Sequence, residues 1–145
     1  MADMAMHSGR PASGAYWIGA VAVLAFELVG CGGYLATVLA NPVAAPPDQQ
    51  MLMAAMPKWQ IPVYAIAVWS GLAGAVLLLM RRRWAVPVLL VSLLCAIGTF
   101  LPFVTVPAVK ALATPANGYA AATVIVLCLL TFLFARSAAA KGILR

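Results

Sequence analysis

Four long apolar segments constrain this chain more than any other feature of its sequence. They run from about 16 to 40, 60 to 80, 84 to 106 and 118 to 136. Each is close to the roughly 20 residues with which a helix crosses about 30 Å of hydrocarbon. The runs are continuous rather than alternating, and lipid cannot satisfy the backbone of an open sheet edge. We therefore predict an all-α protein in which residues 1–145 form a single membrane domain, a bundle of four transmembrane helices.

Composition and charge exclude several other classes of protein. Hydrophobic residues make up 66% of the chain and charged residues 8%, against roughly 45–50% and about 25% in soluble domains. A net charge of +6 suggests nucleic acid in a soluble protein, but here the basic residues lie at the ends of apolar runs. We therefore expect the lipid bilayer as partner and no nucleic acid. The three isolated cysteines and the single histidine predict no disulfide framework, no metal site and no cofactor.

The basic residues also predict an orientation in the membrane. Seven of them belong to one side of the bundle and only Lys58 and Lys110 to the other. Because cytoplasmic loops carry the excess of Lys and Arg, both ends of the chain are predicted to be cytoplasmic. Aromatic residues at the ends of the runs are expected to anchor them at the two interfaces. The seven residues are Arg10, Arg81, Arg82, Arg83, Arg136, Lys141 and Arg145, and the aromatic ones are Tyr16, Trp17, Trp59, Trp84 and Tyr119.

The first outer loop is long enough for a short helix of its own, over about 48–56. Asp48 stands near the positive N-terminal end of such a helix. Met and Leu residues follow, with no basic residue before Lys58. This composition predicts an interfacial helix, either lying on the membrane or covering the end of the bundle.

Glu27 is the most informative polar residue. It lies ~16 Å into the first apolar run, counted at ~1.5 Å per residue, and an acidic group at that depth marks a functional site by default. We expect it to be neutral, because loss of water disfavours the charged form. It handles a proton or a substrate in one interpretation, and bonds neighbouring helices together in the other.

The same depth counting predicts which polar residues surround Glu27. Ser70 on the second run, and Ser92 and Cys95 on the third, fall within about one helical turn of its depth. Thr99 shares a helix face with Ser92 and Cys95. These residues form the predicted polar cluster, unless the Ser and Thr hydroxyls bond the carbonyl groups four residues back in their own helices.

Small residues and one proline predict local packing. The small residues recur at helical spacing on the first two runs and allow close helix approach; they are Gly30, Gly33, Ala67, Gly71 and Ala75. Pro102 is expected to kink the third run and to free a backbone carbonyl near Gly98.

The chain resembles a family of small, uncharacterised four-helix bacterial inner-membrane proteins, sometimes labelled sugar transporters. The resemblance covers nearly the whole chain and implies the fold, the topology and the location, but no activity. A second likeness, around Glu27 and Tyr64–Gly71, is to the small multidrug resistance exporters. There the Tyr/Trp/Ser/Gly segment belongs to the third helix, so we interpret this likeness as convergence. The first resemblance is carried by Tyr16-Trp17-Ile18, Val68-Trp69-Ser70-Gly71-Leu72, Leu77 to Pro87 and Ala140 to Arg145.

Two functional hypotheses remain. No nucleophile–base pair, phosphate-binding loop or haem-ligating histidine within a helix occurs in the sequence, so we predict that the protein is not an enzyme. The first hypothesis is a structural or accessory protein, working as a homo-oligomer or as a subunit of a larger membrane complex. The second is a small proton-coupled permease or exporter that uses Glu27 and an unknown small substrate. A carrier needs a cavity at Glu27 that water reaches, whereas an accessory subunit should bury this residue dry.

Overall fold

The computed structural model describes residues 11–145, and the regular structure of these residues is entirely helical, without strands. Four helical segments are long and apolar enough to cross a membrane, which confirms the predicted all-α class with four candidate spans. They are α1 (Gly14–Leu39), α3 (Gln60–Leu79), α4 (Ala85–Phe100) continued by α5 (Pro102–Thr105), and α7 (Pro115–Ala140). The connections contain the 3₁₀ turn η2 (Pro42–Ala44) and the short helices α2 (Pro47–Ala55) and α6 (Pro107–Leu112).

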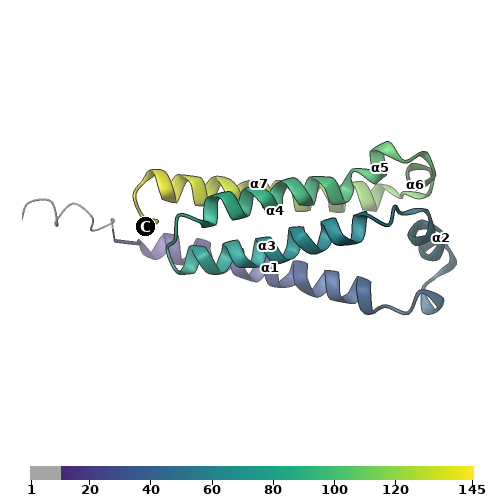
Figure 1. The fold of residues 1–145 in the computed structure, drawn as a ribbon, viewed down its shortest axis with the longest axis horizontal. Coiled ribbons are helices and arrows are strands. Elements are labelled where there is room, and N and C mark those ends of the chain that lie inside the picture. The colour runs from purple at the N-terminus through teal and green to yellow at the C-terminus, as the bar shows by residue number, and fades with distance from the viewer. Residues whose placement is uncertain (1–10) are drawn as a thin grey trace, which may run out of the picture.

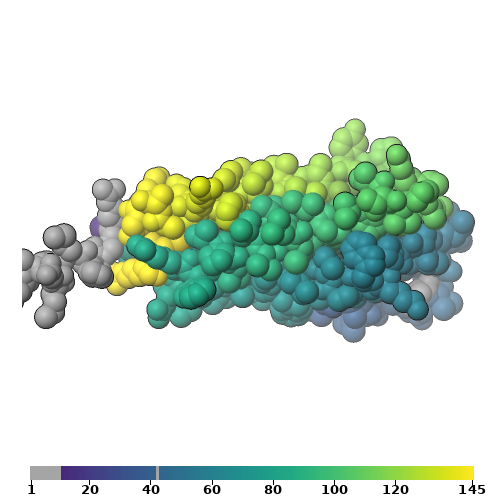
Figure 2. All heavy atoms as spheres, turned by 45° about the horizontal axis from the view of Figure 1, so that its top comes forward, coloured from purple at the N-terminus to yellow at the C-terminus, as the bar shows by residue number. Residues whose placement is uncertain are grey.

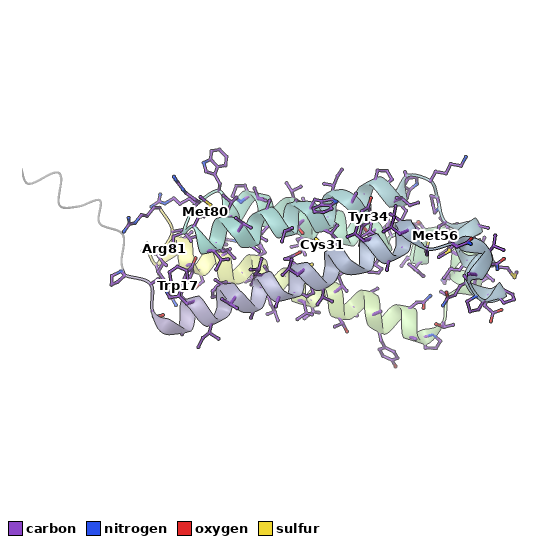
Figure 3. All side chains as sticks on the ribbon, turned by 90° about the horizontal axis from the view of Figure 1, so that it is seen from below. Trp17, Cys31, Tyr34, Met56, Met80 and Arg81 are labelled. Atoms are coloured by element: carbon purple, nitrogen blue, oxygen red, sulfur yellow. The ribbon has the colours of Figure 1, made fainter. Side chains whose placement is uncertain are left out.

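The long helices form one elongated bundle (Figure 1). Helix α3 packs against both α1 and α4, and α4 packs against α7, whereas α1 and α7 touch only over a short stretch. One end of the bundle holds the α3–α4 turn and the C-terminal residues; the other holds α2, α5 and α6 (Figure 1). Trp17, Met80 and Arg81 lie at the first end and Met56 at the second, with Cys31 and Tyr34 between them (Figure 3).

Most of the apolar surface of the bundle faces outward. Only 22%, 33%, 33% and 17% of the residues in the most apolar windows of the four spans are buried. The space-filling view shows the helices as one continuous rod (Figure 2), whose sides carry exposed residues such as Ile18, Val29, Leu94 and Leu130. A single chain in water does not leave so much large apolar surface open, and lipid tails cover it at no cost.

Helix boundaries differ from the predicted ones where capping residues act. Helix α1 begins at Gly14 rather than about 16, because the Ser13 Oγ accepts a hydrogen bond from the Tyr16 N–H (3.3 Å) and caps the helix. Helix α7 begins at Pro115 rather than about 118, since a proline fits the first helical position. Its last turns continue to Ala140, past the predicted end.

Pro102 interrupts the third span where predicted. Helix α4 ends at Phe100 and α5 begins at Pro102, with Leu101 between them in helical conformation. The carbonyl of Gly98, which Pro102 cannot bond, accepts the Leu101 N–H instead (3.2 Å). The proline therefore leaves no free carbonyl there for Glu27. The chain then turns at Val106 into α6, a helix that the sequence did not indicate.

The C-terminal residues fold back onto the arginine turn between α3 and α4. The N–H of Arg83 donates to the carbonyl of Arg145 (2.8 Å), and the N–H of Arg145 donates to the carbonyl of Arg81 (2.6 Å). Leu144, 1% exposed, fills the bundle end between them. Arg81 has a positive φ of 56° and Gly142 one of 74°, and both reverse the chain after a helix end. We call residues 141–145 the C-terminal clasp.

Tyr16 differs from the other predicted interfacial aromatics. Its side chain is 3% exposed, and its hydroxyl donates to the carbonyl of Leu78 at 2.5 Å, which ties α1 to the end of α3. Trp17, Trp59, Trp84 and Tyr119 are exposed by 40% or more.

Candidate site at Glu27 within the bundle

Glu27 lies on the buried face of α1, in register with the other inward residues of that helix. The buried positions are Tyr16, Ala20, Val23, Glu27 and Cys31, which follow the helical period. Glu27 itself is 5% exposed. An acidic side chain on this face is turned away from lipid, as the cost of exposing it to lipid requires.

Gly71 on α3 makes room for the carboxyl group. An ideal Cβ placed on Gly71 would lie 2.6 Å from the carboxyl carbon of Glu27, well inside van der Waals contact. A glycine is therefore needed here for the side chain of Glu27 to lie against α3. Gly71 was predicted as a packing residue, and the group that packs on it is the carboxyl of Glu27 itself.

The carboxyl of Glu27 makes no hydrogen bond with any residue in the described part of the chain. Among the described residues, every buried side-chain nitrogen or oxygen that is fully inaccessible to solvent has a hydrogen-bond partner. The oxygens of Glu27 have no such partner among the described residues, so they must keep some solvent-accessible surface. What they border is a cavity.

The cavity has a volume of about 250 Å³ and lies between all four long helices. Its walls are almost entirely apolar and aromatic apart from Glu27. Helix α1 also contributes Phe26 and Gly30, and α7 contributes Val124 and Cys128. The walls from α3 and α4 include Tyr64, Ala67, Ser92, Ala96, Thr99 and Phe100.

The structure brings together only part of the predicted polar cluster. Ser92 and Thr99 line the cavity with Glu27, whereas Ser70 and Cys95 do not. The Ser92 hydroxyl donates across to the carbonyl of Ala67 on α3 (2.7 Å), and the Thr99 hydroxyl donates to the carbonyl of Cys95 in its own helix (2.8 Å).

Ser70 is occupied locally as well. Its hydroxyl donates to the carbonyls of Ile66 and Ala67 in its own helix, the latter at 3.2 Å. The backbone thus takes every one of these hydroxyl protons, and none reaches Glu27. Ser70 and Thr99 behave as the local alternative predicted, whereas Ser92 bonds across to α3, and the carboxyl of Glu27 borders the cavity.

The sequence did not predict several of the cavity residues, and two of these, Cys128 and Tyr64, carry a thiol or a hydroxyl group. Cys128 is buried on α7 and faces the cavity, and Tyr64 stands on α3 with its ring edge-on to that of Tyr34 (centroids 5.3 Å apart). The signal for Cys128 was its spacing with Thr131 and Ala135, which share one helix face and are buried. Among residues 11–145, no three His, Cys, Asp or Glu side chains gather as metal ligands would.

The other small residues allow close helix approach at α1–α3. An ideal Cβ on Gly30 would lie 3.7 Å from Val68, and one on Gly33 would lie 3.3 Å from the Tyr64 hydroxyl. Ala67 and Ala75 are buried at 5% and 0% exposure. Gly74, which was not among the predicted positions, meets Leu89 of α4, whose Cγ would lie 2.6 Å from an added Cβ.

No known protein family matches this chain, and no curated protein or solved structure was found to be similar to it.

Proposed function

We propose that this protein is a small carrier, a proton-coupled permease or exporter that binds its substrate in the cavity at Glu27. The observation that carries the proposal is a buried carboxyl group, on the wall of a cavity between the long helices, that has no hydrogen-bond partner among residues 11–145. Ionisable residues at such depth are expensive and are retained where they handle ions or protons. In this proposal a proton and the substrate compete for Glu27, and no chemical reaction takes place.

The competing hypothesis of a structural or accessory subunit has a different requirement. A glutamic acid that joins helices has to donate or accept hydrogen bonds between them. Glu27 makes none within the described residues, while the serine next to it on the cavity wall, Ser92, does join α3 to α4. Interhelical bonding is thus supplied by Ser92, which favours a different role for Glu27.

Orientation and location are part of the proposal. Arg81–Arg83 and the C-terminal clasp lie at one end of the bundle, and Met56, close to Lys58 in sequence, lies at the other (Figure 3). The positive end then faces the cytoplasm of a bacterium, with the chain in the inner membrane. Helix α2, which turns Leu52 and Met53 toward the bundle end, would then cover the bundle at the outer interface. These assignments agree with the family of four-helix inner-membrane proteins that the sequence resembles.

Thiol labelling from the outer side tests whether water reaches the cavity. A variant that keeps only Cys128 should react with a charged, membrane-impermeant methanethiosulfonate reagent in reconstituted vesicles. A variant that keeps only Cys95, a residue outside the cavity, is the matched control and should stay unreactive. Equal protection of both thiols would mean a dry, closed bundle, and the carrier would then be excluded.

The Glu27→Gln variant tests whether Glu27 carries the coupled proton. Vesicles that contain a pH-sensitive dye are challenged with a panel of amphipathic compounds, and compound-dependent proton flux is measured. The wild-type protein should give flux and the Gln variant none, although both purify as the same assembly, because an amide can accept hydrogen bonds but cannot exchange a proton. Unchanged flux in the variant would overturn the proposal. Loss of assembly in the variant would identify Glu27 as structural instead.

A further inference from the structure

A second cavity lies beneath α2, at the end of the bundle away from the arginine turn. Its volume is about 240 Å³. Helix α2 closes it with Leu52, Met53 and Met56, while α1, α3 and the α4–α5 segment form the walls. The side chains that α2 turns toward the bundle are therefore not filling a packed core; they cover a space.

The two cavities share three wall residues. Tyr64, Thr99 and Phe100 line both the cavity at Glu27 and the cavity beneath α2. The Tyr64 hydroxyl stands against the backbone of α1 at Gly33, 3.3 Å from where a Cβ would lie. The outer chamber under α2 and the inner chamber at Glu27 therefore adjoin at Tyr64 and Phe100, and we call this place the neck.

Polar groups are distributed unequally along this path. At the inner end, the Glu27 carboxyl has no hydrogen-bond partner among the described residues. At the neck, the Thr99 hydroxyl donates to the carbonyl of Cys95, and the Thr99 carbonyl accepts from the Gln60 side chain at 3.2 Å. The outer chamber is bounded mainly by Met, Leu, Ile and aromatic side chains. Hydroxyl and amide groups occur in the outer chamber too, but its lining has no acidic or basic side chain, so a molecule that lies along the path meets a carboxyl group at the inner end only.

Volume limits how such a molecule fits. Each chamber is larger than the ~150 Å³ cavity that holds benzene, yet smaller than the roughly 300–1,000 Å³ of typical ligand pockets. The two chambers together fall within that range. A ligand of ordinary size therefore has to extend through the neck.

We infer that the two chambers form one binding site for a single-chain amphipathic molecule, whose hydrogen-bonding head lies at Glu27 and whose apolar chain passes Tyr64 and Phe100 to end beneath α2. This inference rests on the proposed function and names the class of its substrate. Helix α2 is the outer wall of the site, and Met53 contacts the chain end.

Protection of Cys128 by primary alcohols of rising chain length tests the inference. The variant that keeps only Cys128 is placed in lipid nanodiscs, and its rate of reaction with N-ethylmaleimide is measured with butanol, hexanol, octanol or decanol. The alcohols are adjusted to equal fractions in the bilayer. All should slow labelling, by about tenfold when the free alcohol is at ~10 times its Kd, and decanol should bind more tightly than butanol.

A pair of substitutions on α2 separates the two chambers. Met53→Trp should fill the outer chamber and abolish the advantage of decanol, while butanol, which fits the inner chamber alone, should protect Cys128 as before. Met51→Trp is the matched control, because Met51 is on the same helix, 56% exposed and outside the cavity, and it should change nothing. If Met53→Trp fails to assemble, Met56→Phe fills the same chamber less severely.

The outcomes distinguish this inference from the function on which it rests. Cys128 that does not react in the absence of any alcohol removes the carrier proposal and this inference together. Cys128 that reacts, and that butanol and decanol protect equally in the wild-type background and in Met53→Trp, overturns the two-chamber site alone. The inner cavity at Glu27 would then be the whole binding site.

Discussion

Replacing Gly71 with alanine tests the contact on which the site depends. An added Cβ would lie 2.6 Å from the Glu27 carboxyl carbon and 2.9 Å from Oε1, while ordinary contact begins at 3.4 Å. The carboxyl carbon must therefore retreat by about 0.8 Å, the difference between 3.4 and 2.6 Å, and Oε2, which is the nearest atom, must retreat further. It is the far end of a flexible side chain beside a cavity, so the cost should fall near the lower end of the about 1–3 kcal/mol typical of overpacking.

Gly32 provides the matched control for this substitution. It is a helical glycine in α1 with no atom within 4 Å of an added Cβ. Gly32→Ala should therefore be neutral or stabilise the protein by up to about 1 kcal/mol, through reduced backbone entropy alone. The gain in backbone entropy is common to both helical glycines and cancels, so the two alanine variants are expected to differ by the overpacking cost alone, about 1 kcal/mol in the free energy of unfolding.

A double-mutant cycle identifies Glu27 as the cause. In a Glu27→Ala background the side chain that obstructs the added Cβ is gone, so Gly71→Ala should behave like Gly32→Ala, with a coupling of about 1 kcal/mol between positions 27 and 71. Unfolding of all variants in mixed micelles titrated with sodium dodecyl sulfate measures these differences. If Gly71→Ala is as harmless as Gly32→Ala, or equally costly without the glutamate, the side chain of Glu27 does not lie against α3 as described.

Three further substitutions test the packing around the site by the same unfolding assay. Tyr16→Phe should cost about 0.5–1.5 kcal/mol, because the carbonyl of Leu78 loses its donor; an unchanged stability would mean that the bond does not join α1 to α3. Leu144→Ala should cost about 2–5 kcal/mol, since Leu144 is the fully buried residue of the C-terminal clasp. A cost near zero would show that the clasp does not pack against the bundle end. Gln60→Leu should cost about 1 kcal/mol through loss of the bond to the Thr99 carbonyl, and no effect would remove Gln60 as a link between α3 and α4.

The number and length of the spans were predictable from the sequence, whereas the rotation of each helix was not. A continuous apolar run in lipid has to form a helix, because only a helix satisfies all of its backbone hydrogen bonds within the segment. The four long helices could therefore be predicted from the lengths of the apolar runs. The same uniform hydrophobicity hides which face is inward, because lipid and protein interior are equally apolar. Depth counting therefore placed Ser70 and Cys95 at the level of Glu27, but they lie on other faces and do not line its cavity.

The chain reversals at Arg81 and at the C-terminal clasp were not predicted, for a different reason. Pro102 signals its own break, because proline has no N–H to donate. Arg81 carries no comparable signal: its left-handed conformation is uncommon for a residue other than glycine, and it depends on backbone bonds to Arg145 that are distant in sequence. The clasp and the buried position of Leu144 arise from these long-range contacts. A single sequence read segment by segment does not contain them.

The site is closed at one end and lightly covered at the other, and this asymmetry bears on how a carrier would work. At the arginine end the Tyr16 ring stacks on Phe134 of α7, with centroids 5.6 Å apart, and Gly19 lies so close beneath Phe134 that an added Cβ would be 2.7 Å from the ring. Beyond this contact α1 and α7 separate, and a groove of about 240 Å³ that includes Phe26 follows the seam between them. Alternating access requires the closed end to open in turn. The stack of Tyr16 on Phe134 and the bond from Tyr16 to the Leu78 carbonyl are then among the contacts that have to break, because they join α1 to α7 and to α3 at this end of the bundle.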